Sequence, residues 1–157
     1  MDFISHALIG AIIAELMQLD LTKTSLIIIG SILPDTSVIP VYSYYGGVKR
    51  AKDNFFKDKR KKPKLITHIY DFSHSILLMT MVLLLSLIYQ PLIFLALGIA
   101  IHVLIDIFTH KKHSPRFLYP LQFHIEGIVE WAKLYYSFKS RIIVYGVLGA
   151  ILLITHL

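Results

Sequence analysis

The sequence predicts an all-α, polytopic membrane protein with about five membrane-embedded helices, folded as a single domain over residues 1–157. Hydrophobic residues make up 55% of the chain, and the mean hydropathy is +0.65, above that of an ordinary soluble domain. A soluble core of this size could not bury so much apolar surface. Two further observations are the uncharged runs, such as residues 92–101, and the basic residues clustered between such runs.

The first two apolar segments are short. Residues 3–19 form one, and residues 26–33 form a helix that should end at Pro34. Thr22 or Thr24 would supply the N-cap of this second helix. Both segments are marginal for a full span, which takes about 20 residues. They therefore form either a tilted hairpin or a partly re-entrant pair.

The middle of the chain is polar and basic. Residues 35–47 are expected to be irregular because they contain Pro40 and a Gly46-Gly47 break. Residues 48–64 carry many Lys and Arg side chains. Two phenylalanines give this stretch an apolar edge, so it could be a helix at the membrane surface.

The second half contains the longest apolar runs. Residues 71–89 predict a membrane helix, Gln90-Pro91 a tight turn, and residues 92–109 a helix that returns across the bilayer. A polar loop and an amphipathic stretch at 125–136 follow. The final apolar helix is expected at 141–157.

Lys and Arg residues lie mainly in two segments, and this asymmetry predicts the topology. Nine of the 16 lie between residues 49 and 64, and six more between residues 111 and 141. Because cytoplasmic loops carry the excess of Lys and Arg, the loop at about 46–67 and the segment at about 110–140 should be cytoplasmic. The turn at Gln90-Pro91 then lies on the other side, and the N-terminus is cytoplasmic.

Three ionisable residues recur at helical spacing near the end of the fourth apolar run. His102, Asp106 and His110 are spaced i, i+4 and i+8, which places them on nearly one helix face. Imidazoles and carboxylates are ligands for zinc-like ions, and ionisable groups inside an apolar run are costly unless paired or metal-bound. His110 adjoins two lysines, so a solvated position is a second interpretation for it.

The predicted topology brings more candidates to the same membrane face. His6 starts the first segment, Asp35 follows the second, and His74 lies near the start of the third. With His102 and Asp106 they exceed the four ligands of one tetrahedral ion and favour a two-metal hydrolytic site. Asp35, with its two oxygens, would bridge the ions. The predicted metal ligands are His6, Asp35, His74, His102, Asp106 and His110, with Asp35 and Asp106 as the candidate catalytic residues.

The expected cofactor is one or two divalent ions, with zinc first and manganese or iron as alternatives. Cysteine is absent, so only histidine and carboxylate side chains could hold such ions. Taken alone, His6 also fits an interfacial histidine, and Asp35 fits a helix end in contact with water. His68 is a further candidate ligand. Outer partners are expected from Ser5, Asp71, Ser75 and Thr109.

The basic stretch at 48–64 has two interpretations. Its positive charges would attract anionic lipid headgroups at a cytoplasmic surface. They could also attract nucleic acid, but no aromatic platform or recognition motif accompanies them. We therefore expect membrane lipids, and not nucleic acid, as partners.

Five motifs occur in a definite order along the chain. They are Ser5-His6, Gly30-Ser31-Ile32-Leu33-Pro34-Asp35, Asp71-Phe72-Ser73-His74-Ser75, His102-x-x-x-Asp106-x-x-Thr109-His110, and Tyr119-Pro120-Leu121. Over about residues 1–121 this order resembles the YdjM family of small inner-membrane proteins, which are described as metal-dependent hydrolases. The resemblance implies an inner-membrane location. The family often has His-Arg-Gly before the histidine at position 74, where this chain has Ile69-Tyr70-Asp71.

A looser likeness extends to zinc-dependent phospholipase C and related single-strand nucleases. It implies metal ligation by His6, Asp35, His74, His102 and Asp106. This chain lacks the later His-x-x-x-Glu pair of those enzymes, so a third zinc site is not expected.

These observations together predict a membrane-bound metal-dependent hydrolase of a phosphoester in a lipid or lipid-linked substrate. Two alternatives stay open. One is a non-catalytic membrane protein that binds metal, and the other is a protein that recruits a partner through its basic stretch. A transporter is less favoured, because Glu15 is nearly the only ionisable group in the far half of the predicted spans.

Overall fold

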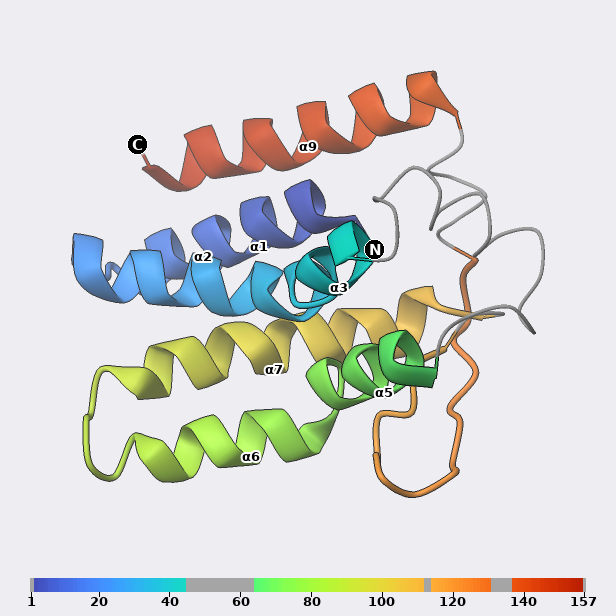
Figure 1. Ribbon diagram of the computed structural model, residues 1–157. Coiled ribbons are helices and arrows are strands. Elements are labelled where there is room, and N and C mark those ends of the chain that lie inside the picture. The colour runs from blue at the N-terminus through green and yellow to red at the C-terminus, as the bar shows by residue number, and fades with distance from the viewer. Residues whose placement is uncertain (1, 45–63, 112–113, 131–136, 157) are drawn as a thin grey trace.

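The computed structural model describes residues 2–44, 64–111, 114–130 and 137–156. Within these ranges every regular element is a helix, and there is no strand. The helices are α1 (Phe3–Leu16), α2 (Leu21–Thr36), α3 (Ile39–Tyr44), α5 (Lys64–Ser73), α6 (Ile76–Leu85), α7 (Leu92–Thr109) and α9 (Phe138–His156). Five of them lie alongside one another in the order α9, α1, α2, α7, α6 (Figure 1). The all-α prediction is confirmed.

The described helices supply fewer membrane spans than the five expected. Three segments are long and apolar enough to cross a bilayer. They are Leu21–Tyr44, which comprises α2 and α3, Leu92–Thr109 and Phe138–His156. The bent pair α5 and α6 would make a fourth. Helix α1 has 14 residues and so is only about 21 Å long, against a hydrocarbon core of about 30 Å.

Helix α2 differs from its prediction at both ends. Its N-cap is Asp20, not Thr22 or Thr24, and the Asp20 carboxylate accepts a hydrogen bond from the Lys23 backbone N–H. The Lys23 side chain also pairs with this carboxylate at 2.7 Å, and these bonds lower the pKa of Asp20. The helix continues through Pro34 instead of ending there.

Pro34 lies in the last turn of α2, and its own carbonyl is satisfied by two serines. Its carbonyl oxygen accepts bonds from the Ser37 hydroxyl at 2.8 Å and from the Ser73 hydroxyl at 3.1 Å. The Ser37 N–H returns to the helical pattern by bonding Leu33 O. The Ser73 bond comes from α5, so a neighbouring helix satisfies a carbonyl near the end of α2.

The predicted continuous helix at 71–89 is wrong. The chain forms α5 from Lys64 to Ser73, breaks at His74 and Ser75, and continues as α6 with a bend of 56°. At the break Ser75 has an extended backbone and its hydroxyl caps α6 at the Leu78 N–H, while the Ile76 N–H bonds to Phe117 O from a distant loop. The break places His74 between two helices.

The other predicted elements agree with the structure only in part. Helix α7 has the bounds expected for the fourth apolar run, and the C-terminal helix begins at Phe138, slightly before the expected start. Residues 39–44 are helical, although 35–47 was expected to be irregular. The basic stretch at 48–63 and residues 131–136 lie outside the described residues, while 125–130 are not helical.

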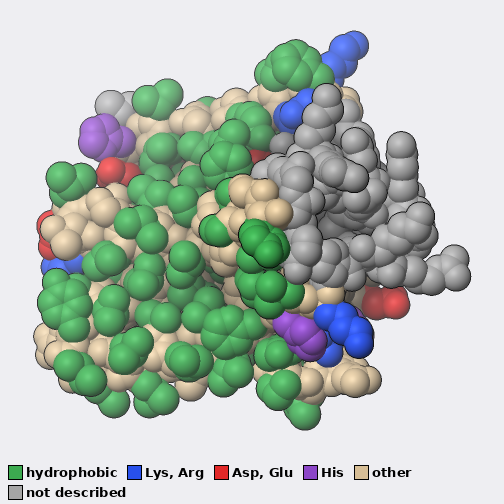
Figure 2. Space-filling model, in the orientation of Figure 1, with side chains coloured by type: hydrophobic (Ala, Val, Ile, Leu, Met, Phe, Trp, Pro, Cys, Tyr) green, Lys and Arg blue, Asp and Glu red, His purple; other side chains and the backbone are tan. Residues whose placement is uncertain are grey.

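Several polar groups are buried in this protein, and many large apolar side chains face outward. Buried polar residues include His6, His74, His102 and Asp106, whereas many leucines and isoleucines are exposed. Figure 2 shows hydrophobic side chains spread over the visible face, with charged side chains near its ends. This distribution is expected of helices that meet lipid instead of water.

Helices α2 and α7 approach each other at two glycines. A Cβ atom added to Gly30 would collide with Leu95 O, and one added to Gly98 would collide with Ile27 O. Both obstacles are backbone atoms, which cannot move aside without shifting a helix. Small residues at such crossings let the backbones of membrane helices pack closely.

We therefore expect Gly98→Ala to destabilise the protein, by about 1–3 kcal/mol as is typical of overpacking. The matched control is Gly146→Ala in α9, where nothing lies within 4 Å of the added Cβ. This control should unfold at or slightly above the wild-type temperature. Thermal unfolding in detergent measures both changes, and equal midpoints for Gly98→Ala and wild type would refute the role given to this contact.

Candidate metal centre

The six predicted ligands gather at one end of the helix bundle, around Asp106. The four elements that supply them are far apart in the sequence. The ligands are His6 on α1, Asp35 on α2, His74 at the α5–α6 break, and His102, Asp106 and His110 at the end of α7. His6, His74, His102 and Asp106 have fully buried side chains, whereas those of Asp35 and His110 are 23% and 18% exposed. Solvent therefore reaches this centre at Asp35 and His110.

Four of these residues form a group that could hold a metal ion. One ligand atom from each of Asp35, His74, His102 and Asp106 lies within 4.8 Å of the others. Nε2 of His74 lies 3.4 Å from Asp35 Oδ1, and Nε2 of His102 lies 3.3 Å from Asp106 Oδ2. Tetrahedral ligands at about 2.1 Å from an ion lie about 3.4 Å from each other. These two separations fit donors around a central ion, whereas the His74–Asp106 and His102–Asp35 pairs, at 3.8 and 4.0 Å, would have to close slightly.

The two histidines of this group are oriented by backbone carbonyls. His102 Nδ1 lies 2.7 Å from Ser31 O, and His74 Nδ1 lies 2.9 Å from Tyr70 O. A carbonyl oxygen only accepts, so each Nδ1 must carry the proton. In the neutral form of each ring, Nε2 is then unprotonated and faces the carboxylates.

This arrangement needs a positive charge at its centre. Nε2 of His74 and Nε2 of His102 are buried and make no hydrogen bond to any described residue. Lone pairs that face carboxylates across 3.3–4.0 Å repel one another unless a proton or a cation lies between them. The donor set, two imidazoles and two carboxylates, suits a zinc-like divalent ion.

The other oxygen of Asp106 meets the two remaining histidines. His6 Nε2 lies 3.1 Å and His110 Nδ1 lies 3.3 Å from Asp106 Oδ1, and the Thr109 hydroxyl donates to the same oxygen at 3.4 Å. The sequence predicted Asp35 as the bridging carboxylate. In the structure Asp106 is the carboxylate with one oxygen toward each set. Metal ligation by His6 and His110 stays a prediction.

His6 also supports the centre through its ring. It stacks on the His102 ring with centroids 3.8 Å apart and 22° between the planes. Its Nδ1 is buried and has no hydrogen-bond partner among the described residues. His6 thus holds both the ring of one candidate ligand and the carboxylate of another.

The expected outer partners are only partly where the sequence placed them. Thr109 contacts Asp106 as expected, whereas Ser5 bonds to Asp2 and the Ser75 hydroxyl bonds to Phe72 O. The sequence analysis did not single out Ser73, whose hydroxyl lies 3.1 Å from His74 Nδ1. The orienting carbonyls of Ser31 and Tyr70 have no sequence signal, since every residue has a carbonyl.

Two further candidates lie apart from the cluster. His68 Nδ1 lies 3.3 Å from the Tyr119 hydroxyl. Asp71 pairs with Arg116, which the sequence analysis did not single out. Glu15 and His156 face each other at the opposite end of the bundle, 3.4 Å apart.

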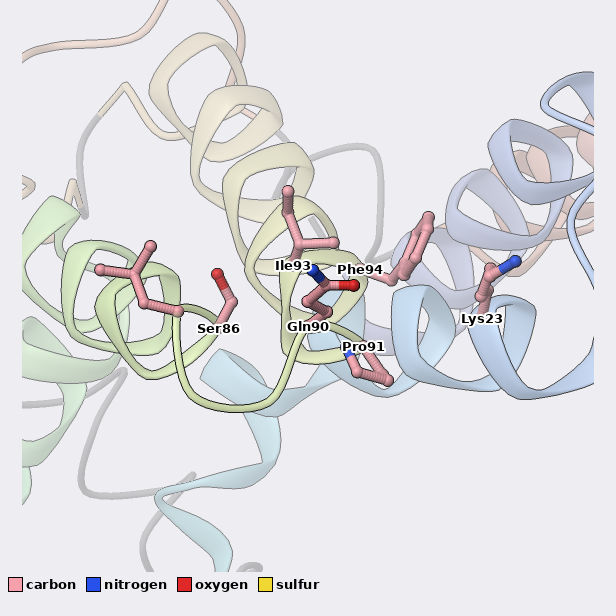
Figure 3. Close-up of a pocket in the computed structure, with 7 residues that line it drawn as sticks. Lys23, Ser86, Gln90, Pro91, Ile93 and Phe94 are labelled. Atoms are coloured by element: carbon pink, nitrogen blue, oxygen red, sulfur yellow. The ribbon is translucent and has the colours of Figure 1, made fainter.

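A cavity of about 490 Å³ lies at the opposite end of α7 from the histidine and aspartate cluster. Lys23, Ser86, Gln90 and Phe94 line it, together with neighbouring apolar residues (Figure 3). The Lys23 ammonium is already engaged by Asp20 and lies 5.7 Å from the centre of the Phe94 ring. This cavity contributes nothing to the cluster around Asp106.

The sequence profile of the YdjM inner membrane protein family matches residues 1–156. No curated protein and no solved structure matches the chain significantly. The profile thus spans α1 to α9 and includes every residue of the candidate centre.

We expect detergent-purified wild-type protein, after incubation with zinc or manganese, to retain the divalent ion through desalting. Asp106→Ala should abolish retention and His102→Ala should reduce it strongly, because each removes a donor from the four-residue group. Elemental analysis gives the ion-to-protein ratio.

The matched control is His156→Ala, which also removes one imidazole but lies at the other end of the bundle. It should retain as much metal as wild type. A wild-type protein that stays metal-free with every ion tested would show that protons, not a cation, neutralise the cluster.

Proposed function

This chain belongs to the YdjM inner membrane protein family, and from this premise we propose that it is a membrane-bound metal-dependent hydrolase. The proposed substrate is a phosphoester in a lipid or lipid-linked molecule. The observation that carries the proposal is the pair of buried imidazole nitrogens, on His74 and His102, that face two carboxylates without a hydrogen-bond partner in the described chain. Such a cluster is costly in an apolar setting unless it binds something cationic.

The residues of the centre would have different roles in such a site. Asp35, His74, His102 and Asp106 would hold the ion, and Ser31 O and Tyr70 O fix the two imidazole rings. When bound, a divalent ion supplies Lewis-acid polarisation of a phosphoryl oxygen and lowers the pKa of water. His6 holds the Asp106 carboxylate in place from the opposite side. Asp35 and Asp106 are proposed as catalytic residues because both carboxylates belong to the four-residue group that would hold the ion.

The substrate assignment rests on where the centre lies. It is at the end of helices whose outer faces are apolar, including exposed Leu104 and Phe108 on α7 itself. Asp35 and His110 are the partly exposed members of the cluster. A headgroup at the membrane interface could therefore reach the centre while its acyl chains stay in the bilayer.

Catalysis fits the arrangement better than transport. The buried ionisable groups in the described parts of the chain gather at one end of the bundle. At the other end Glu15 and His156 form an exposed pair, and the first part of α7, from Leu92 to Ile101, is uncharged. A polar path across the bilayer is therefore not apparent within the described residues.

We also propose that the centre faces the cytoplasm, with the N-terminus on the same side. The support is the excess of Lys and Arg in residues 49–64 and 111–141. Membrane lipids would be the immediate neighbours of these charges.

This orientation can be tested with single cysteines, because the chain has none of its own. Gln90→Cys should react with a membrane-impermeant maleimide in right-side-out vesicles, and Lys64→Cys should react in inverted vesicles. The opposite pattern would reverse the topology and move the proposed site to the outer side.

The hydrolase itself can be tested in proteoliposomes that contain phosphatidic acid or phosphatidylglycerol as the phosphoester probe, with manganese or zinc supplied. We expect lipid products, measured by mass spectrometry, to form with wild type and with the control His156→Ala. Asp106→Asn should lower the rate by more than the roughly 10–100-fold typical for loss of an outer-sphere partner.

Metal retention without turnover of any phosphoester would instead favour a non-catalytic metal-binding membrane protein. A rate that is equal in wild type and Asp106→Asn would refute the proposed site.

A further inference from the structure

A buried carboxylate on α5 holds an arginine. Asp71 is 5% exposed and lies one helical turn before His74. Its Oδ2 accepts a hydrogen bond from Arg116 Nε at 2.6 Å, and its Oδ1 accepts one from the Arg116 backbone N–H at 3.2 Å. Both oxygens of the carboxylate thus hold the same residue, which fixes the side chain and the loop that carries it.

The two terminal amino groups of Arg116 are not used by Asp71. A guanidinium has five N–H donors, of which the Nε–H is used by Asp71. The terminal amino groups of Arg116 make no hydrogen bond to any residue that the structure describes, and the side chain is 16% exposed. The Tyr119 ring lies against the guanidinium at 5.2 Å, and the Tyr119 hydroxyl lies 3.3 Å from His68. The guanidinium is therefore held in place by Asp71 and Tyr119, in a side chain that is partly exposed.

The loop of Arg116 is attached to the helix break that carries His74. Phe117 is fully buried in the core with Val82 and Ile99, and its carbonyl accepts the Ile76 N–H at 2.9 Å. Asp71 holds the loop just before the break, and Ile76 holds it just after. The loop of Arg116 is thus bonded to the chain both before and after the candidate metal ligand His74.

We propose that Arg116 binds an anionic phosphate oxygen of the substrate, with Asp71 as the residue that positions it. This inference rests on the proposed function, since it names the chemical group of the substrate that Arg116 would recognise. A planar guanidinium whose two amino groups make no hydrogen bond to any described residue matches two oxygens of a phosphate, whereas Lys would offer only a point charge. The chemistry recognised is a phosphate group with at least two unesterified oxygens, carried by a lipid or free in solution.

A pair that served only to hold the loop would behave differently. The bond from the Arg116 backbone N–H to Asp71 does not need the guanidinium. A lysine at this position would keep the positive charge beside Asp71 but lose the planar edge. Comparison of the two side chains therefore separates recognition of phosphate from attachment of the loop.

The test is equilibrium binding to the full-length protein in detergent, stripped of metal with a chelator so that only the protein's own groups bind. The probes are inorganic phosphate and, in nanodiscs, phosphatidic acid at a fixed fraction in phosphatidylcholine. We expect wild type to bind phosphate, Arg116→Lys to bind more weakly, and Arg116→Gln to bind at least about tenfold more weakly, as loss of charged hydrogen bonds implies. Asp71→Asn should weaken binding less than Arg116→Gln, because the guanidinium remains.

Two controls keep the result interpretable. Lys64→Gln removes one exposed positive charge from the same helix without touching the pair, and it should bind like wild type. Arg116→Gln leaves Asp71 buried without its cation, so the double variant Asp71→Asn, Arg116→Gln serves if the single variant fails to fold. The double variant should fold and lose phosphate binding.

The outcomes separate this inference from the proposed function. Binding of free phosphate and of phosphatidic acid, both lost with Arg116, would support the shared chemistry, and binding of the lipid alone would identify the headgroup as its source. Equal binding by wild type and Arg116→Gln, or no binding by wild type, would overturn the inference. Metal retention, measured on the same variants, should not change with Arg116, so a failed metal centre would appear there and not in phosphate binding.

Discussion

The contact between α2 and α7 at Gly30 and Gly98 is the constraint on which the candidate centre depends. The two helices run in the same direction along the bundle (Figure 1), so residues that follow each glycine lie at the same end. One turn beyond Gly98, His102 reaches the carbonyl of Ser31, the residue after Gly30. Asp35 follows one turn later on α2, beside His74 and His102. A larger side chain at either glycine would separate the helices and the ligands with them.

The apolar surroundings explain why hydrogen bonds at this centre are so completely arranged. In lipid, each unsatisfied polar group costs several kcal/mol. The imidazoles of His74 and His102 therefore use backbone carbonyls for one nitrogen, and the carbonyl of Pro34 is satisfied by serines. The Nε2 atoms of His74 and His102 differ from these groups, because they are buried and make no hydrogen bond to any described residue.

Asp106 connects the parts of the centre. One of its oxygens faces His74 and His102, and the other faces His6 and His110. The helical spacing of His102, Asp106 and His110 alone places these three together. Helix α1 then contributes His6 through its contact with α7, and the α5–α6 break contributes His74. Arg116 joins the same region through Asp71, on a loop far along the chain.

The sequence by itself determined the membrane character, the all-α class, the bounds of α7 and the set of residues that gather at one end of the bundle. It could do so because hydropathy, helical spacing and the distribution of Lys and Arg are local properties. The break at His74 and Ser75, the passage of α2 through Pro34 and the place of Asp106 between the histidines were decided by tertiary structure. Each depends on hydrogen bonds or close packing between distant segments, such as Ser73 to Pro34 O and Gly30 against Leu95 O. The orienting carbonyls of Ser31 and Tyr70 belong to the same class, since a backbone oxygen has no residue type and only the folded chain can place it beside an imidazole.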